Sequence, residues 1–287
     1  MQKNNNKTMD KDDFNKPEFE IIFKELNNLI KHLYRKGLYM TSWYGTLPSN
    51  PKKQHFFPYF KDYHEIVGHS NRGTDYKPLK FASDDARIPW YLYWEIAQVI
   101  THGPKLNVNS RILDAGGTSS LCSCYLASLG IEVHSIDINP ELIANANKIA
   151  KVMNWELHSY KMDMTKLDFD DNFFDHSYSI CVFEHLNYEL KQGALKEISR
   201  CTKKDGTLSI TFDYKNPAPY IAFLGFDKSP QNQLSTIDDI SRSFLNTNVF
   251  EMYGNKTFYD NNKSYLVHSE FNNSPYTFGS IFLKNTK

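Results

Sequence analysis

The sequence has no excess of charge of either sign. Among its 287 residues, 33 are Lys or Arg and 33 are Asp or Glu, so the formal net charge at pH 7 is zero when the histidines are neutral. Proteins whose main task is to bind nucleic acid usually carry an obvious basic excess. The balance therefore predicts a protein without a nucleic-acid partner.

Long hydrophobic runs are also missing. The longest, Tyr220–Phe226, is far shorter than the stretch of about 20 apolar residues that spans a bilayer. The first letters of the chain, MQKNNN, lack the apolar segment of a secretory signal peptide. We therefore expect a soluble, cytoplasmic protein without a membrane partner.

Cysteine is scarce and does not form a spaced framework. The four cysteines fall inside stretches that have the pattern of helices and strands: Cys122, Cys124, Cys181 and Cys201. This is typical of reduced, cytosolic thiols. Cys122 and Cys124 are two residues apart on a predicted helix, so they point in different directions and do not chelate one ion together. The sequence predicts no metal site.

One stretch has the residue order of a ligand-binding βαβ unit. A short apolar strand ends in Asp114 and breaks at Gly116 and Gly117, a helix follows, and a second strand, 131–136, is followed by Asp137. A glycine turn lets a ligand approach the backbone, and the helix N-terminus offers free N–H groups. An acid about twenty residues further on suits ribose hydroxyls. The unit therefore predicts a site for a nucleoside-containing cofactor.

The rest of the chain alternates strands and helices. After the βαβ unit we expect a helix at 140–152, strands at 156–160 and 174–180, a helix at 188–201, a strand at 207–212, a helix at 236–245, and closing strands at 249–253 and 276–283. This order predicts a mostly parallel sheet with helices on both faces, which binds ligands at the carboxyl ends of its strands. Asp114, Asp137, Asp163 and the stretch Cys181–His185 all fall at such ends, which favours one shared site.

Composition divides the chain into three segments. Residues 1–16 are polar and aperiodic and are predicted to be a disordered tail. Residues 17–107 are expected to form a helical and aromatic lid that contacts the substrate, with helices at 17–37 and 88–101. Residues 108–287 are expected to form the cofactor-binding domain.

Six short motifs, in this order and spacing, resemble one enzyme family. They are Ile112–Gly117 (ILDAGG), His134–Asn139 (HSIDIN), Lys161–Met164 (KMDM), Phe174–Leu186 (FDHSYSICVFEHL), Asp205–Leu208 (DGTL) and the closing Tyr276–Lys284 (YTFGSIFLK). The sequence resembles the class I S-adenosylmethionine-dependent methyltransferases, in particular the small-molecule group typified by the ubiquinone/menaquinone methyltransferases. The resemblance implies a Rossmann-like α/β fold with a mostly parallel seven-stranded sheet and an N-terminal helical and aromatic cap. It implies S-adenosylmethionine as the cofactor.

The resemblance also implies which residues hold the methionine end of the cofactor. They follow two of the predicted strands: Asp114, Gly116, Gly117, Thr118, Ser179 and Cys181. Gly116 and Gly117 and the turn after them would cradle this end, and Asp114 would help to hold its ammonium group. Ser179 and Cys181 would line the methionine side, partly through backbone carbonyls.

The nucleoside end is assigned in the same way, by resemblance. The implied residues follow the next two strands: Asp137, Ile138, Asp163 and Met164. Asp137 would accept from both ribose hydroxyls, and Ile138 would pack on the adenine. Asp163 would accept from the adenine amino group, with Met164 beside it. Asp168 or Asp170 is the alternative partner for that amino group.

The glycine turn departs from the family pattern Asp-x-Gly-x-Gly-x-Gly. Here Thr118 and Ser120 stand at the second and third glycine positions, unless the paired glycines shift the turn by one residue. A β-branched residue is strained at positive φ, so we expect Thr118 at negative φ in a rearranged loop. This departure leaves open a protein that binds the cofactor without catalysis.

A hydroxyl acceptor needs a base that takes its proton during methyl transfer. The candidates are His185 and Glu184 after the fourth strand, Asp213 after the fifth, and His64 or His69 in the predicted lid. The sequence favours His185 among them.

Three functions are compatible with these residues. The first is an O-methyltransferase that acts on a sugar, a glycan precursor or a secondary metabolite. The second is a nicotinamide-dependent oxidoreductase, which the missing G-x-G-x-x-G and the expected C-terminal hairpin argue against. The third is a catalytically inactive cofactor-binding protein. The first implies a small-molecule acceptor as the partner, and a homodimer is left open.

Overall fold

The computed structural model describes residues 5–41, 47, 88, 90–215, 234–261, 267–268 and 275–287. Several predictions concern residues outside these ranges: the lid histidines His64 and His69, most of the aromatic region, and residues 216–233 of the Pro/Asn-rich loop. None of the described helices combines the length and the apolar character needed to cross a bilayer.

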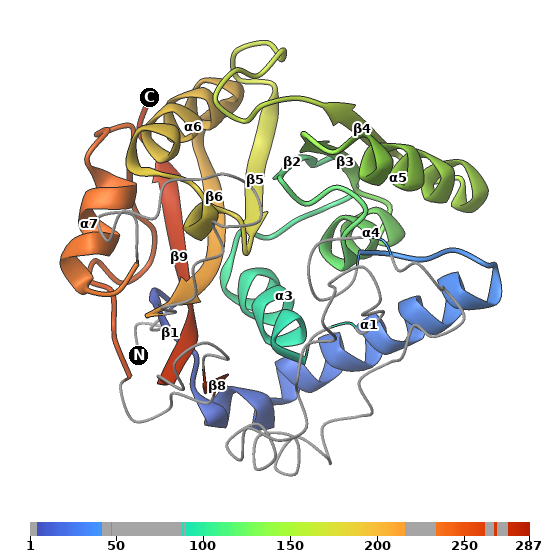
Figure 1. Cartoon of the computed structure of the whole chain (residues 1–287), viewed down its shortest axis with the longest axis horizontal. Coiled ribbons are helices and arrows are strands. Elements are labelled where there is room, and N and C mark those ends of the chain that lie inside the picture. The colour runs from blue at the N-terminus through green and yellow to red at the C-terminus, as the bar shows by residue number, and fades with distance from the viewer. Residues whose placement is uncertain are drawn as a thin grey trace.

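Within the described residues, nine strands form one sheet (Figure 1). Five parallel strands make its centre and one edge, in the order β4 (Leu157–Lys161), β3 (Glu132–Asp137), β2 (Arg111–Ala115), β5 (Phe174–Ile180) and β6 (Thr202–Tyr214). β9 (Pro275–Asn285) pairs antiparallel with β6 and carries three short antiparallel strands: β1 (Lys7–Thr8), β7 (Phe250–Met252) and β8 (Val267–His268). The predicted Rossmann-like fold class is confirmed, and β1 and β8 are additions to the seven strands expected.

The sheet separates two hydrophobic cores. The first holds α1 (Pro17–Arg35), α3 (Trp90–His102), α4 (Leu121–Ser128) and the end of α5 (Pro140–Met153). The second holds α6 (Tyr188–Cys201) and α7 (Ile237–Leu245). Successive strand residues face opposite sides, so Ile112 enters the first core and Leu113 the second. Because α1 and α3 pack into the core of the sheet, these two helices of the predicted lid are part of the domain itself.

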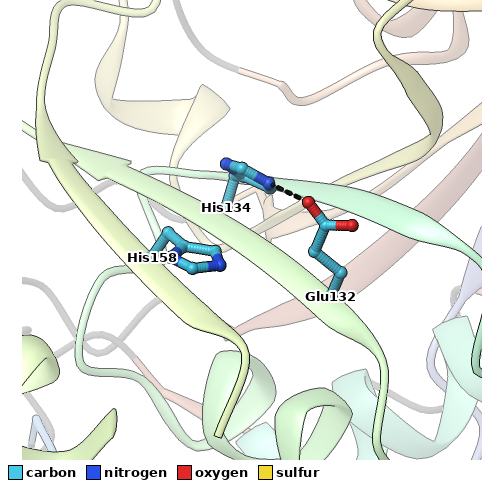
Figure 2. A group of neighbouring side chains, drawn as sticks. All are labelled: Glu132, His134 and His158. Carbon is cyan, nitrogen blue, oxygen red and sulfur yellow. Dashed lines mark hydrogen bonds and ion pairs between the residues drawn. The ribbon is translucent and has the colours of Figure 1, made fainter. Parts of the chain in front are cut away.

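Among the described helices, α4 and α5 are the ones that pack against two neighbouring strands, and both lie on one face of the sheet. α4 and α5 contact β3 and β4, and both helices contribute to the first core. The opposite face of the two strands carries the polar side chains of Glu132, His134 and His158 (Figure 2). Aromatic side chains of the loop before β5, Phe169 and Phe173, lie against His134 there.

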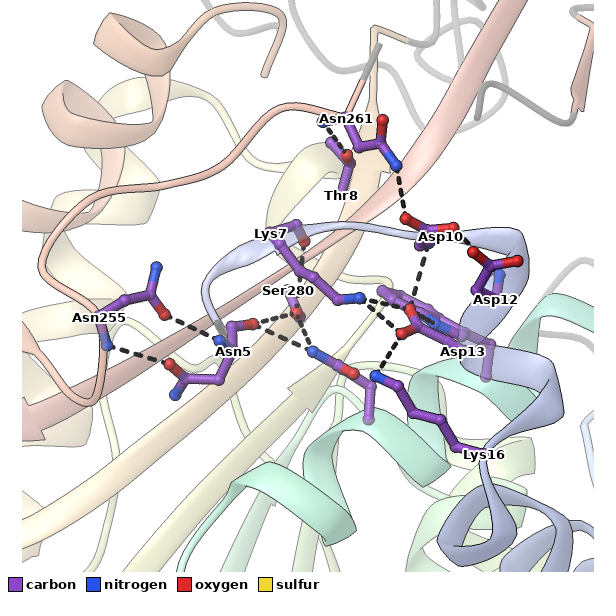
Figure 3. A network of polar contacts seen from close by, with 12 residues as sticks. Asn5, Lys7, Thr8, Asp10, Asp12, Asp13, Lys16, Asn255, Asn261 and Ser280 are labelled. Atoms are coloured by element: carbon purple, nitrogen blue, oxygen red, sulfur yellow. Dashed lines mark hydrogen bonds and ion pairs between the residues drawn. The ribbon is translucent and has the colours of Figure 1, made fainter. Parts of the chain in front are cut away.

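The predicted disordered tail is wrong for residues 5–16. Lys7 and Thr8 pair with β9, and a 3-10 helix, η1 (Lys11–Asn15), leads into α1. Asn5 and Asn6 are buried, and their backbone N–H groups both donate to the side-chain oxygen of Asn255 (Figure 3). In return, the N–H of Asn255 donates to Asn5 Oδ1 and its side-chain amide donates to the carbonyl of Asn6. The polar composition predicted disorder. In the structure these polar groups form hydrogen bonds with β9 and the segment around Asn255.

Asp13 is the centre of this N-terminal network (Figure 3). Its carboxylate is 1% exposed and accepts from Lys7 Nζ at 2.6 and 2.7 Å, from Lys16 Nζ at 2.6 Å and from the indole of Trp94 at 2.9 Å. Burial alone would raise the pKa of this carboxyl, but Lys7, Lys16 and Trp94 outweigh it and hold the pKa below its usual value of 3.8. The N-terminus is therefore tied to α3 by a buried charge.

We expect Asp13→Asn to lower the free energy of unfolding by about 3 kcal/mol, because Lys7 would stay buried without its counter-charge. Urea unfolding measures the change, and Asp12→Asn, at an exposed position of the same 3-10 helix, is the matched control. Since the folded pKa of Asp13 is depressed, its contribution is present above pH 3.8 and is lost as the pH falls further. Equal stability of the two variants would show that the N-terminal network is not important for stability.

Candidate active site

The residues predicted from the sequence lie together at the carboxyl ends of the parallel strands. Asp114 and Asp137 lie near the ends of β2 and β3, which pair in register, and Asp163 follows β4. The N–H of Met162 donates to the carbonyl of Asp137 over 3.1 Å, so the segment after β4 runs beside the end of β3. Cys181 and Asp213 mark the ends of β5 and β6.

Both glycines of the turn are required by their surroundings. Gly116 has φ +82°, and a Cβ there would lie 2.7 Å from Val182 Cγ1. A Cβ on Gly117 would overlap the carboxylate of Asp114. Thr118 is absent from the described residues with positive φ, as expected, and Ser119 takes the left-handed conformation with φ 63° instead. The loop is therefore rearranged by one residue relative to the family pattern.

Two segments that the sequence did not connect hold Ser119 in this conformation. The Ser119 hydroxyl receives the Asn145 side-chain amide of α5, and its carbonyl accepts the N–H of Thr41 at 3.0 Å. The same Asn145 amide donates to the carbonyl of Tyr39 at 2.7 Å. Residues 38–41, which follow α1, thus lie against the glycine turn. The role of Asn145 is visible only in these tertiary contacts, because a single Asn within a helical pattern does not indicate a partner.

Some backbone N–H groups of the turn have no acceptor among the described residues. The N–H groups of Gly117, Thr118 and Ser119 donate to no acceptor in the part of the chain that the structure describes, although all three residues are buried. Buried N–H groups are almost always paired, and a turn before a helix N-terminus favours an anionic partner. These donors fit the carboxylate of an amino-acid moiety such as that of the predicted cofactor.

Asp114 lies beneath this turn. Its side chain is fully buried, and Oδ2 accepts from the hydroxyls of Ser123 and, at 3.5 Å, Ser120, whereas Oδ1 has no partner in the described part of the molecule. Burial raises the pKa of this carboxyl to about 6, and the two hydroxyls moderate the shift. Asp114 therefore braces the loop against α4, and its predicted contact with an ammonium group stays a prediction.

Asp137 and Ile138 have the surroundings of nucleoside-binding residues. The Asp137 Oδ1 atom accepts the N–H of Asn139 at 2.8 Å, which fixes the carboxylate at the strand end. Burial raises the pKa of Asp137, and the N–H groups of Asn139 and Ile138 act against the rise. Ile138 is 60% exposed beside it, an apolar surface that an adenine ring would cover. Both residues fit the roles that the resemblance implies.

Asp163 is exposed at the neighbouring strand end. Its Oδ1 atom accepts from both the N–H and the hydroxyl of Thr165 at 2.8 Å, and Met164 beside it is partly buried. The turn positions Asp163 next to the loop that carries Asp137. The alternatives, Asp168 and Asp170, are both exposed further along the loop. The adenine contact of Asp163 stays a prediction.

Ser179 and Cys181 are placed differently from each other. The Ser179 hydroxyl is fully buried and donates to the carbonyl of Ala115 at 2.8 Å, so it joins β5 to β2 below the turn. Cys181 has φ 52° and its thiol donates to the carboxylate of Glu95 on α3. Burial and the nearby acids raise the pKa of Cys181, which keeps it a neutral thiol. Neither side chain is free to face the turn.

Glu95, Glu184 and Asp213 form a cluster of buried carboxyl groups at the ends of β5 and β6. The ligand atoms of Cys181, Glu184 and Asp213 lie within 4.8 Å of one another, and Glu184 Oε1 accepts the N–H of Asp213 at 3.3 Å. Burial, followed by the charge of Asp213, raises the pKa of Glu184, and burial raises that of Glu95 to about 8. Oε2 of each glutamate has no hydrogen-bond partner in the described structure. The cluster can hold and exchange protons at neutral pH.

Glu95 is a site residue that sequence reasoning missed. It lies in α3 between Trp94 and Ile96, is fully buried, and contacts the thiol of Cys181. The sequence did contain a clue to it. A mostly apolar helix is buried on all sides, and a glutamate in such a helix is unusual enough to indicate a functional role.

His185 has the chemistry of a neutral imidazole. Burial and the nearby ammonium of Lys191 lower its pKa to about 4. Its Nε2 atom lies 4.0 Å from Glu184 Oε1, at the limit of an ion pair. An imidazole with so low a pKa is a weak base. Which of His185, Glu184 and Asp213 acts as the base stays a prediction.

Comparisons with known proteins address the domain and its fold. Residues 113–210 match a protein family described as "Methyltransferase domain". A search of curated proteins finds no match. The ubiquinone/menaquinone group is not singled out, so that narrower assignment stays a prediction.

Three solved structures are similar in fold. The [4+2]-cyclase SpnF has a TM-score of 0.54 at 16% identity, covering 79% of this chain and 94% of its own. The MccD protein has a TM-score of 0.51 at 18% identity, with 67% and 96% covered. Geranyl diphosphate methyltransferase in complex with SAM has a TM-score of 0.51 at 12% identity, with 67% and 85% covered.

Proposed function

We propose that this chain, whose residues 113–210 match a methyltransferase domain, uses S-adenosylmethionine to methylate a hydroxyl group of a small molecule. A sugar, a glycan precursor or a secondary metabolite is the proposed acceptor class. The observation that carries the choice of a hydroxyl is the buried pair of Glu184 and Asp213 at the strand ends. A hydroxyl must lose its proton when its oxygen is methylated, whereas a thioether or tertiary amine has no proton to lose.

Three groups of this chain would hold the cofactor. The N–H groups of the Gly117–Ser119 turn would bind its carboxylate, Asp137 its ribose hydroxyls and Ile138 its adenine. When bound, S-adenosylmethionine supplies a methyl group on a positively charged sulfur. The protein would then mainly have to align the reacting groups, because a direct displacement needs the acceptor oxygen, the methyl group and the sulfur in line.

The carboxyl pair would take the acceptor's proton. Two buried carboxyl groups this close do not both ionise readily, so one proton is shared and one carboxylate stays available as the base. As the new oxygen–carbon bond forms, the hydroxyl proton passes to that carboxylate. The raised pKa of Glu184 strengthens the group as a proton acceptor near neutral pH.

A second candidate is a protein that binds the cofactor without transferring its methyl group. Ser119 stands at positive φ in a loop where the family has glycines, which alters the cradle for the methionine end. One of the similar structures is that of a cyclase, so this fold also serves other reactions. The closing antiparallel pair β6–β9 is present and argues against the dinucleotide-binding dehydrogenase.

Calorimetric titration with S-adenosylmethionine, S-adenosylhomocysteine and NAD tests the proposal. We expect micromolar affinity, about −8 kcal/mol, for both sulfur compounds and none for NAD. Methyl transfer is then followed with labelled cofactor on a panel of hydroxyl acceptors. Binding without transfer to any acceptor supports the second candidate, and binding of NAD alone would support the oxidoreductase.

A further inference from the structure

A second group of ligand side chains lies away from the candidate active site. Glu132 is the first residue of β3, and His134 follows on the same face, so both are distant along the strand from its carboxyl end. His158 of β4 is the register partner of His134 and therefore shares this face. Figure 2 shows the three side chains directed toward one another from the two strands.

Their ligand atoms are close enough to share one ion. One ligand atom from each side chain lies within 4.8 Å of the other two. His134 Nε2 is 2.8 Å from Glu132 Oε1, and the His134 and His158 rings are 5.0 Å apart between centroids. Two imidazoles and one carboxylate are a ligand set that zinc takes, with water in the fourth position.

His134 is prepared as a ligand by its surroundings. The side chain is buried, with its Nε2 atom beside Glu132 Oε1. Its Nδ1 atom lies 3.2 Å from the hydroxyl of Tyr160, and the Tyr160 ring stacks on it. Metal-bound histidines commonly have the second nitrogen fixed in this way.

The surroundings of the three ligands are partly apolar. The rings of Phe169, Phe173 and Phe174 surround His134 at centroid distances of 5.8, 5.3 and 5.5 Å. Arg111 Nε donates to Glu132 Oε1 at 2.9 Å. The Oε1 atom is thus engaged by Arg111 and His134, and Oε2 is the oxygen of Glu132 that would face an ion.

We propose that Glu132, His134 and His158 bind one zinc ion on the face of β3 and β4 opposite α4 and α5. The ion would replace the hydrogen bond between Glu132 and His134 and would attach the edge strand β4 to β3. The sequence predicted no metal site because its three ligands come from two strands and only the register aligns them. The proposal does not depend on the reaction at the carboxyl ends of the strands.

Calorimetry of the full chain with zinc chloride tests the site, together with the visible spectrum of the cobalt-substituted protein. We expect one zinc ion per chain, a rise in the melting temperature, and the intense ligand-field bands of a tetrahedral site. Replacing a ligand should remove most of the affinity, so His158→Gln is expected to weaken binding by about 100-fold. His158 is partly exposed, and its replacement should leave the fold intact.

Two further variants make the outcome decisive. Cys181→Ser removes a ligand from the other possible cluster and should not change zinc affinity. Glu156→Gln removes the carboxylate 3.3 Å from His158 Nε2 and should preserve binding. Zinc binding that survives His158→Gln but is lost in Cys181→Ser would overturn the proposal and place the ion in the active site. Absence of zinc binding by the unmodified chain would overturn it as well, leaving Glu132 and His134 as a hydrogen-bonded pair of the sheet.

Discussion

Replacing Asp137 by alanine is expected to weaken the binding of S-adenosylmethionine by about 100-fold or more. The proposed contacts are two hydrogen bonds from ribose hydroxyls to a carboxylate that the N–H of Asn139 already orients. Each hydrogen bond to a charged group contributes about 1.5–3 kcal/mol, so losing both costs about 3 kcal/mol at least. Calorimetric titration of the purified variant measures the change.

The matched control for Asp137→Ala is Glu141→Ala. Glu141 is an exposed acid in the first turn of α5, four residues further along the chain, and its side chain takes no part in the cap that holds Asn139. Its removal changes the local charge by the same amount and should leave the affinity unchanged. An Asp137→Ala variant that melts like the parent and still binds normally would show that another residue holds the ribose.

Replacing Glu184 by glutamine is expected to lower the rate of methyl transfer by about 10²- to 10⁴-fold, the range that general base catalysis provides. Affinity for the cofactor should stay the same, because Glu184 lies at the ends of β5 and β6 and not at the glycine turn. Single-turnover measurements at saturating cofactor separate the chemical step from binding. The comparison variant is His185→Gln, which should keep most of the rate since the pKa of His185 is about 4.

The pH profile adds a second observation for Glu184. A base acts in its deprotonated form, and burial and Asp213 raise the pKa of Glu184 above its ordinary value of 4.5. The rate of the parent protein should therefore rise with pH over the range above 4.5, and Glu184→Gln should lose this rise. If His185→Gln lost the rate and the pH dependence while Glu184→Gln kept both, the imidazole would be the base despite its surroundings.

The sequence predicted the repeating elements of the sheet with little error. The strand at 174–180 and the helix at 188–201 have the expected bounds, and Thr236 caps α7 as its pattern indicated. These segments carry their own information, since side-chain periodicity and capping residues act within a few positions of the chain. For the same reason the acids after β2, β3 and β4 could be predicted to share one edge of the sheet.

Side chains that act through long-range contacts could not be predicted. Asn5 and Asn6 pair with residues about 250 positions away, and their composition alone indicated disorder. Glu95 reaches Cys181 across 86 positions, and Asn145 reaches the turn at Ser119 from another helix. The sequence also could not show that both His185 and Glu184 are withdrawn from solvent, which shifts the pKa of each and depends on what packs around each group.

The sequence by itself determined the fold class and the edge of the sheet that carries the cofactor residues, because strand ends and glycine turns are local features. Tertiary structure alone decided which groups are buried together: the carboxyl pair of Glu184 and Asp213, and the aligned ligands Glu132, His134 and His158. Proximity and desolvation arise only when distant segments pack. They determine the protonation of Glu184 and Asp213, on which the proposed methyl transfer depends. They also determine the positions of Glu132, His134 and His158, on which the proposed zinc binding depends.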